Sequence, residues 1–349
     1  MTSTSMYSDE RPKLLEVRNL HTNFFTDEGI VRAVNGVNFE ISYGQTVGVV
    51  GESGCGKSIA AASILRIVPR PGRIVDGEIL LHHHKDIADP LASTTISDLV
   101  TLNPNGSEIR KIRGAEISMI FQEPMTALSP IHTIGDQVGE VIILHQKLDK
   151  TAARVQVIEM LERVGMPQPR RTIDRYPFEL SGGMRQRAVI AMALSCHPSL
   201  LIADEPTTAL DVTTEAQILQ LLRNLQRELG MAILFITHNL GVVAQMTEQV
   251  IVMYLGREVE VANVDSIFYN AKHPYTCALL RSIPRLGKKS GKLLQTISGS
   301  VPDPYNIPKG CPFHPRCKEK IQNICEIQDP PLVNIAPGHQ VRCHLYSRP

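Results

Sequence analysis

Apolar and polar positions follow two different periods along the chain. Residues 37–41 alternate between apolar and polar side chains, which predicts a half-buried strand. Short apolar stretches predict further strands at 14–17, 47–50, 77–81, 116–121, 199–205 and 231–236. Helical periodicity covers 59–67, 135–144, 152–164, about 182–195 and about 213–229. This succession predicts an α/β fold with a helical insertion at about 131–180.

Three segments depart from this pattern. Residues 1–12 are polar and predict a disordered leader. Phe24 and Phe25 fall in a polar region that predicts a turn ending at Gly29; an aromatic residue here could stack on an adenine ring, although core packing is the commoner role. Residues 82–105 begin with three histidines and predict a solvated surface loop, because adjacent side chains on extended backbone point to opposite faces and make a poor metal site.

Composition and charge exclude several classes of protein. The 349 residues are 43% hydrophobic and 20% charged, as in an ordinary globular protein. Thirty-six basic and 35 acidic side chains leave a formal charge of +1, which gives no electrostatic case for a nucleic-acid partner. The apolar stretches are far shorter than the roughly 20 residues of a membrane helix, and the N-terminus lacks the apolar core of a signal peptide. We therefore expect a cytosolic protein that reaches a membrane only through a partner.

A glycine-rich stretch follows the predicted strand 47–50. Residues 51–58 fit the phosphate-loop pattern G-x-x-x-x-G-K-S, placed between a strand and a helix as the mechanism requires. The glycines allow backbone N–H groups to approach phosphate oxygens, and the helix start adds positive potential. Lys57 can then reach the β- and γ-phosphates, and the Ser58 hydroxyl can ligate Mg²⁺. The residues expected to bind nucleotide here are Gly51, Ser53, Gly54, Cys55, Gly56, Lys57, Ser58 and Ile59.

A second phosphate-ready loop lies far from the first in the sequence. Ser181 is a good helix N-cap, and Gly182 and Gly183 expose backbone N–H groups at the start of the next helix. A capped helix with a glycine hinge is the alternative interpretation. Asp211 caps another predicted helix, 213–229.

Polar side chains follow the predicted buried strands. Asp204 and Glu205 end one strand, Gln122 ends another, and His238 follows a third. Since ligands bind at the carboxyl edge of open α/β sheets, these side chains are expected to lie near the phosphate loop. A nucleotide site needs one acid for Mg²⁺ and a second group for the attacking water, so Asp204 suits the metal and Glu205 the water.

These motifs, in this order and spacing over about 14–265, resemble the nucleotide-binding subunit of an ABC transporter. The resemblance identifies 51–58 as Walker A, 180–184 as the signature, and 209–211 as the D-loop. It implies a P-loop ATPase core with an antiparallel β subdomain and a helical subdomain. It also implies adenine stacking by Phe24. The roles it implies for the remaining residues are catalysis by Glu205, His238 and Gln122, and Mg²⁺ ligation by Ser58, Asp204 and Gln122. ATP is expected between this Walker A loop and the signature of a second subunit, with Ser181, Gly182, Gly183 and Asp211 contributing to the partner's site.

The C-terminal tail narrows the resemblance to one group of ABC transporter ATPases. Residues 273–280 and 310–317 resemble the C-terminal extension of oligopeptide and dipeptide importer ATPases. The expected organisation is a leader at 1–12, a nucleotide-binding domain at 13–265 and an extension at 266–349. The resemblance implies a second ATPase subunit, two permease subunits, an external solute-binding protein and a location at the cytoplasmic face of the inner membrane.

Four of the seven cysteines lie in the last forty residues. Cys311, Cys317, Cys325 and Cys343 have the spacing C-x5-C-x7-C-x17-C, and in a reducing cytosol such clustering favours a metal site over disulfides. Four thiolates can hold Zn²⁺ or an iron–sulfur cluster. The resemblance favours a 4Fe–4S cluster, with zinc or free thiols as alternatives.

Together these features predict ATP hydrolysis coupled to the import of di- or oligopeptides. Related importers for nickel, opines, oligosaccharides or glutathione are alternatives. A non-transport ABC ATPase, a regulatory module that binds ATP without hydrolysis, and an exporter are less well supported. The chain lacks tandem cassettes and long coiled coils, it retains Glu205 and His238, and its tail is of importer type.

Overall fold

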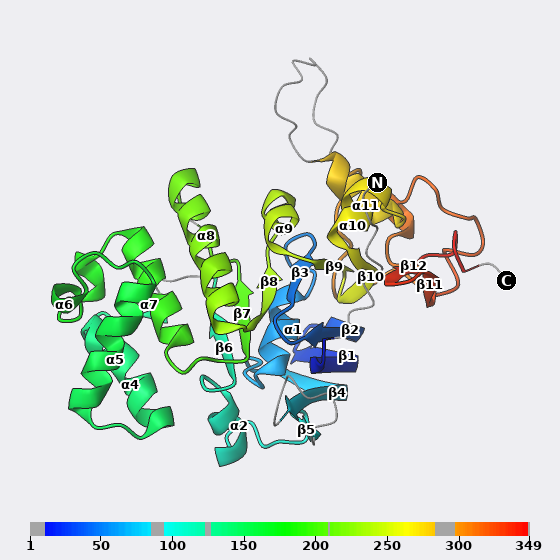
Figure 1. Ribbon diagram of the computed structural model, residues 1–349. Coiled ribbons are helices and arrows are strands. Elements are labelled where there is room, and N and C mark those ends of the chain that lie inside the picture. The colour runs from blue at the N-terminus through cyan, green and yellow to red at the C-terminus, as the bar shows by residue number, and fades with distance from the viewer. Residues whose placement is uncertain (1–10, 85–93, 123–126, 209, 283–296, 348–349) are drawn as a thin grey trace.

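The computed structural model describes residues 11–84, 94–122, 127–208, 210–282 and 297–347. Two sheets organise this part of the chain (Figure 1). The larger has eight strands in the order β11-β12-β10-β9-β3-β8-β7-β6, and the smaller has four in the order β2-β1-β4-β5. Within the described residues, no helix is long and apolar enough to cross a bilayer.

The larger sheet has a parallel centre. Strands β3 (Thr46–Val50), β8 (Ala232–Ile236) and β7 (Leu200–Asp204) are completely buried, as their apolar sequences require. They pair in parallel with one another, with β6 (Ile117–Ile120) on one side and β9 (Gln249–Tyr254) on the other. The carboxyl ends of β3, β8, β7 and β6 therefore lie at one edge of the sheet.

The C-terminal extension continues this sheet. Strand β10 (Arg257–Asn263) pairs antiparallel with β9, β12 (His339–Arg342) pairs with β10, and β11 (Leu332–Ala336) completes the edge. Helices α10 (Val264–Asn270) and α11 (Pro274–Arg281) lie between β10 and the tail. The chain beyond residue 265 is thus built onto the core sheet, and it shares a buried apolar cluster with β9 and β10.

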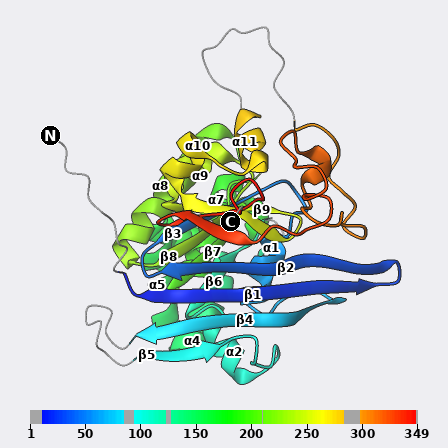
Figure 2. The same ribbon diagram turned by 90° about the vertical axis from the view of Figure 1, so that its right-hand side faces the viewer.

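The smaller sheet is antiparallel and consists of β1 (Lys13–Thr26), β2 (Gly29–Ser42), β4 (Gly72–His84) and β5 (Thr94–Asp98). Figure 2 shows its strands side by side beneath the tail hairpin. One apolar cluster joins this sheet to the core sheet and to α1 (Lys57–Ile64). A short helix, α2 (Ser107–Ile112), leads into β6.

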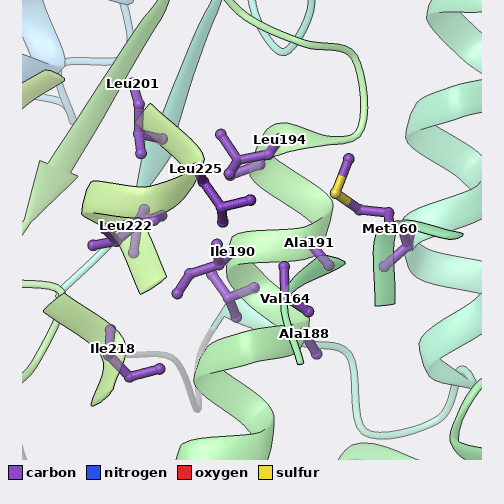
Figure 3. Packing of buried hydrophobic residues seen from close by; sticks show 14 of the residues in the cluster. Met160, Val164, Ala188, Ile190, Ala191, Leu194, Leu201, Ile218, Leu222 and Leu225 are labelled. Carbon is purple, nitrogen blue, oxygen red and sulfur yellow. The ribbon is translucent and has the colours of Figure 1, made fainter. Parts of the chain in front are cut away.

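The predicted insertion at 131–180 is helical. It contains α4 (Ile134–Gln146), α5 (Lys150–Arg163), the short α6 (Pro169–Thr172) and a 3₁₀ turn, Pro177–Glu179. Helix α7 (Gly182–Leu194) joins this layer to the core sheet, because Ala188 and Ala191 face Met160 and Val164, whereas Ile190 faces the apolar side of α8 (Figure 3). Helix α8 (Val212–Leu229) and α9 (Leu240–Met246) follow β7 and β8.

Two predictions about the N-terminal region were wrong. Phe24 and Phe25 lie on β1, which continues to Thr26, and not in a turn. The histidines at 82–84 extend β4 and pair with β5, so 82–84 and 94–98 are strands and not a loop; residues 85–93 lie outside the described part. The ends of these strands lack the apolar alternation on which strand prediction depends.

The prediction of a disordered leader at 1–12 was wrong for residues 11 and 12. Residues 1–10 lie outside the described part, but Arg11 pairs with Glu248 at 2.6 Å and the Pro12 carbonyl accepts the Tyr43 N–H. Both contacts attach the chain to the folded core before β1 begins. Residues 11–12 therefore belong to the ordered structure.

Candidate active site

Four strand ends meet at one edge of the core sheet, as predicted. The phosphate loop follows β3, and Asp204 ends β7. His238 lies two residues beyond the end of β8, and Gln122 lies two residues beyond the end of β6. The parallel pairing of these strands is what brings the four segments together. Asp204 and Glu205 are adjacent in sequence but face different partners, which divides the site into two parts.

The phosphate loop has the backbone that its glycines were predicted to allow. Gly54 and Gly56 have φ values of 75° and 99°, and a Cβ at Gly56 would overlap the Ala33 carbonyl oxygen. The buried Lys57 ammonium donates to the Gly51 and Glu52 carbonyls at 2.9 and 3.0 Å. Lys57 is therefore held inside the loop. Its neighbours at the loop surface, which are exposed, are Ser53, Gly54 and Ser58.

Asp204 forms the first part of the site. It is 4% exposed, and its Oδ1 atom has no hydrogen-bond partner. Burial raises the pKa of this carboxyl, the nearby Glu205 carboxylate adds to that effect, and the Ser58 hydroxyl opposes it. A buried carboxylate oxygen without a partner, close to a serine hydroxyl, suits a bound Mg²⁺, which prefers oxygen ligands.

Glu205 forms the second part, where three side chains converge on its carboxylate. His238 Nδ1 lies 3.1 Å from Oε1, while Gln122 Nε2 and Thr208 Oγ1 donate to Oε2 at 3.1 and 3.0 Å. Burial alone raises the pKa of Glu205, but the hydrogen bonds from His238 and Thr208 outweigh it and hold the pKa below its usual value. The carboxylate is therefore ionised and able to accept a proton at neutral pH.

The backbone of Glu205 is unusual for an L residue. Its φ is 47°, in the left-handed region, and its N–H donates to the Ile236 carbonyl at 2.9 Å. This conformation ends β7 and turns the side chain toward the ends of β6 and β8. Residues in such sparsely populated conformations cluster at functional sites.

The second phosphate-ready loop has the predicted cap. The Ser181 hydroxyl accepts the Met184 N–H at 3.4 Å, and Gly182 and Gly183 form the first turn of α7, at its positive end. In Figure 1, α7 lies with α4 and α5, apart from α1 and its phosphate loop. Asp211 caps α8 by accepting the Thr213 and Thr214 N–H groups, and Ala209 lies outside the described residues.

The aromatic pair on β1 has partners within the chain. The half-buried Phe24 ring lies over Gly72, where an added Cβ would overlap it, and the Arg73 guanidinium is 4.2 Å from the centre of the Phe25 ring. Ile59, the other predicted contact outside the loop itself, is partly buried on α1. Adenine stacking by Phe24 stays a prediction.

The four tail cysteines gather in one neighbourhood as free thiols. Burial, together with the neighbouring thiols, raises the pKa of Cys311 to about 11 and that of Cys343 to about 12. The Cys311 N–H also donates to the Cys325 carbonyl at 2.8 Å. Across the described ranges, however, no group of three or more His, Cys, Asp or Glu side chains is arranged to hold a metal ion.

Sequence reasoning missed three side chains that contact the site. Thr208 donates to Glu205, whereas Tyr275 and Arg316 of the C-terminal extension both contact Glu52 of the phosphate loop. The position of Thr208 just after the paired acids offered a weak local signal. Tyr275 and Arg316 offered no local signal, because each contacts a residue more than 200 positions away in the sequence.

Comparisons with known proteins agree with this geometry. The sequence model of a family described as ABC transporter matches residues 34–208, and one described as oligopeptide/dipeptide transporter, C-terminal region, matches 259–325. The oligopeptide transport ATP-binding protein AppD of Bacillus subtilis is 49% identical over 335 residues, covering 96% of this chain and 97% of that protein. The dipeptide transport ATP-binding protein DppD of the same organism is 47% identical over 337 residues, 96% of each.

Solved structures give the same fold. The ATP-binding cassette MJ0796, in a dimeric post-hydrolysis state bound to ADP and Pi, superposes with a TM-score of 0.60 at 27% identity. The match covers 72% of this chain and 99% of the cassette. With the phosphate loop and the paired acids at one sheet edge, these similarities show that the chain belongs to the family of ABC transporter ATP-binding subunits.

Proposed function

We propose that this chain hydrolyses ATP to drive uptake of di- or oligopeptides through a membrane permease. The proposal of ATP hydrolysis rests on the Glu205 carboxylate, which is ionised and held by three side chains beside the buried Asp204. The peptide part is supported by the relatives, which are named as peptide transport ATP-binding proteins, and by the match at 259–325.

Each residue of the site has a distinct role in the proposed reaction. Lys57 and the loop amides bind the β- and γ-phosphates, as in other P-loop ATPases. Ser58, Asp204 and Gln122 would hold Mg²⁺, which neutralises charge on the phosphates when bound. The Glu205 carboxylate accepts the proton of the attacking water, while His238 and Gln122 orient the carboxylate and the water. Water then attacks the γ-phosphorus and ADP leaves.

The separation of the two phosphate-ready loops supports a shared site. One ATP is proposed to lie between Walker A of one subunit and Ser181–Gly183 of a second ATPase subunit, with Asp211 at the same junction. Phe24 is proposed to stack on the adenine. Closing on ATP and reopening after hydrolysis would move the two permease subunits.

The domain organisation follows from the same proposal. Residues 13–265 form the nucleotide-binding domain, with its helical subdomain at about 131–180, and 266–349 form the importer-type extension. The chain would work at the cytoplasmic face of the inner membrane, attached through the permease. An external solute-binding protein would supply the peptide.

Reconstitution with the permease pair and solute-binding protein tests the transported solute. We expect di- or oligopeptides to stimulate ATP hydrolysis severalfold, because the transport cycle couples the two events. Nickel complexes, opines, oligosaccharides and glutathione serve as control solutes. Stimulation by one of these and not by peptides would contradict the proposed substrate class.

We further propose a 4Fe–4S cluster on Cys311, Cys317, Cys325 and Cys343, with Zn²⁺ as the alternative. The gathered thiols support it, although their side chains would have to move closer together to ligate a metal. Anaerobic purification should yield a brown protein with about four irons per chain. A Cys317→Ser/Cys325→Ser variant should lose that iron. A colourless protein with one zinc would favour the alternative, and one with neither metal would exclude both.

A further inference from the structure

The C-terminal extension holds the phosphate loop at Glu52. Arg316, which lies between Cys311 and Cys317 in sequence, donates to both carboxylate oxygens of Glu52, at 2.7 and 3.0 Å. This bidentate geometry is the strong form of an arginine–carboxylate pair. The two residues are 264 positions apart, so the contact joins the end of the chain to its nucleotide loop.

The backbone of Glu52 is held as well. Its N–H donates to the Tyr275 hydroxyl at 2.9 Å, and its carbonyl accepts the Lys57 ammonium at 3.0 Å. Lys57 is the residue proposed to bind the β- and γ-phosphates. A shift of Glu52 would therefore move one of the carbonyl oxygens that hold the Lys57 ammonium.

The groups that hold Glu52 are themselves fixed. The Arg316 side chain is 4% exposed, and its Nε donates to the Ser298 carbonyl at 3.2 Å. Tyr275 lies in an aromatic cluster, with its ring centre 4.7 Å from that of Tyr254 and 5.4 Å from that of Phe313. Such a preorganised contact loses little conformational freedom when it acts.

Charge gives Arg316 a second effect. The Glu52 carboxylate is an anion in a loop that must accept a polyphosphate, and like charges at close range repel in a partly buried site. The guanidinium neutralises that carboxylate. Without Arg316, the loop would be both less constrained and more negative.

We propose that Arg316 and Tyr275 are positioning residues through which the C-terminal extension sets the shape and charge of the phosphate loop, and thereby the affinity for ATP. The inference rests on the proposed role of residues 51–58 in binding ATP. The extension is thus part of the nucleotide site through its contacts with Glu52.

Binding of trinitrophenyl-ATP to the purified full chain, followed by fluorescence, tests this inference. We expect Arg316→Ala to raise Kd about tenfold, the scale of one lost charged hydrogen-bond pair, with Arg316→Lys intermediate. Tyr275→Phe, which keeps the ring, should raise Kd about threefold. In the Arg316→Ala background, Glu52→Gln should recover much of the affinity because the unpaired carboxylate is gone.

Asp329→Ala is the matched control. It removes another ion pair between the extension and the core sheet, with Arg257, which does not touch Glu52. Its Kd should stay within about twofold of wild type, since exposed pairs contribute little. A wild-type Kd for Arg316→Ala, an equal rise for Asp329→Ala, or no recovery with Glu52→Gln would overturn the inference. Undiminished binding by Lys57→Ala would instead overturn the proposed function of the loop.

Discussion

Replacing Glu205 by glutamine is expected to lower kcat for ATP hydrolysis by at least about a hundredfold, within the range for loss of a general base. An amide cannot accept the proton of the attacking water. It has nearly the same shape, however, and can still contact His238, Gln122 and Thr208. ATP affinity should therefore change by no more than about twofold, because the lost interaction acts in the transition state.

Phosphate release under single-turnover conditions and trinitrophenyl-ATP binding measure the two quantities separately. Glu228→Gln is the control, since Glu228 lies on α8 and pairs with Arg163 at the surface, at 3.7 Å. It should hydrolyse ATP at the wild-type rate. Hydrolysis by Glu205→Gln at a near wild-type rate would contradict the assignment of Glu205 as the base.

The catalytic edge of the sheet could be predicted from sequence because its signals are local. A buried apolar strand such as β7 can be recognised from its local sequence, and the residues just after it must lie at the strand's carboxyl end. Parallel strands then place Asp204, Glu205 and His238 together without any further information. The left-handed φ of Glu205 could not be foreseen, because no glycine marks it.

The antiparallel sheet was predicted less well for a physical reason. The histidine end of β4 is stabilised by pairing with β5 and by contacts such as His83 with Glu116 at 2.8 Å, not by a buried apolar face. Composition therefore suggested a loop. At a polar strand end of this kind, cross-strand pairing and side-chain contacts decide whether a strand forms, and the local sequence pattern does not show them.

Contacts between the tail and the core lie beyond sequence reasoning altogether. Arg316 was visible only as a residue between two cysteines, and nothing in the local pattern pointed to Glu52. The cysteine spacing predicted a metal site, but within the described residues no group of side chains is arranged to hold a metal ion. It did not reveal that the same segment reaches the phosphate loop.

Replacing Glu260 by alanine is expected to detach the extension and lower the free energy of unfolding by roughly 3–5 kcal/mol, the cost of breaking a buried pair from one side. Glu260 lies on β10 and is 0% exposed. Its carboxylate accepts the Lys272 and His273 N–H groups at 2.7 and 2.9 Å and contacts His339 Nε2 at 2.8 Å. The substitution leaves the buried His273 N–H and His339 Nε2 without this partner, and the part-buried Lys272 N–H as well.

Urea unfolding measures the loss, and Asp174→Ala is the control. Asp174 pairs with Arg154 at 2.8 Å, but both side chains are at least half exposed, so this variant should lose less than about 1 kcal/mol. Equal stability losses in the two variants would contradict a special role for Glu260. Limited proteolysis should cut Glu260→Ala sooner than wild type near 271–273, because the backbone of Lys272 and His273 has lost its acceptor.

The same variant should also weaken ATP binding, which a purely local loss of stability would not do. Glu260 fixes the His273 backbone, and burial lowers the pKa of His273 to about 3, so its imidazole is neutral and Nδ1 accepts the Tyr275 N–H at 3.1 Å. Tyr275 in turn holds Glu52. We therefore expect Glu260→Ala, measured without urea so that it remains folded, to raise the Kd for trinitrophenyl-ATP severalfold. Asp174→Ala should leave this Kd unchanged. An unchanged Kd in a Glu260→Ala variant whose extension has detached would mean that the phosphate loop keeps its shape without the tail.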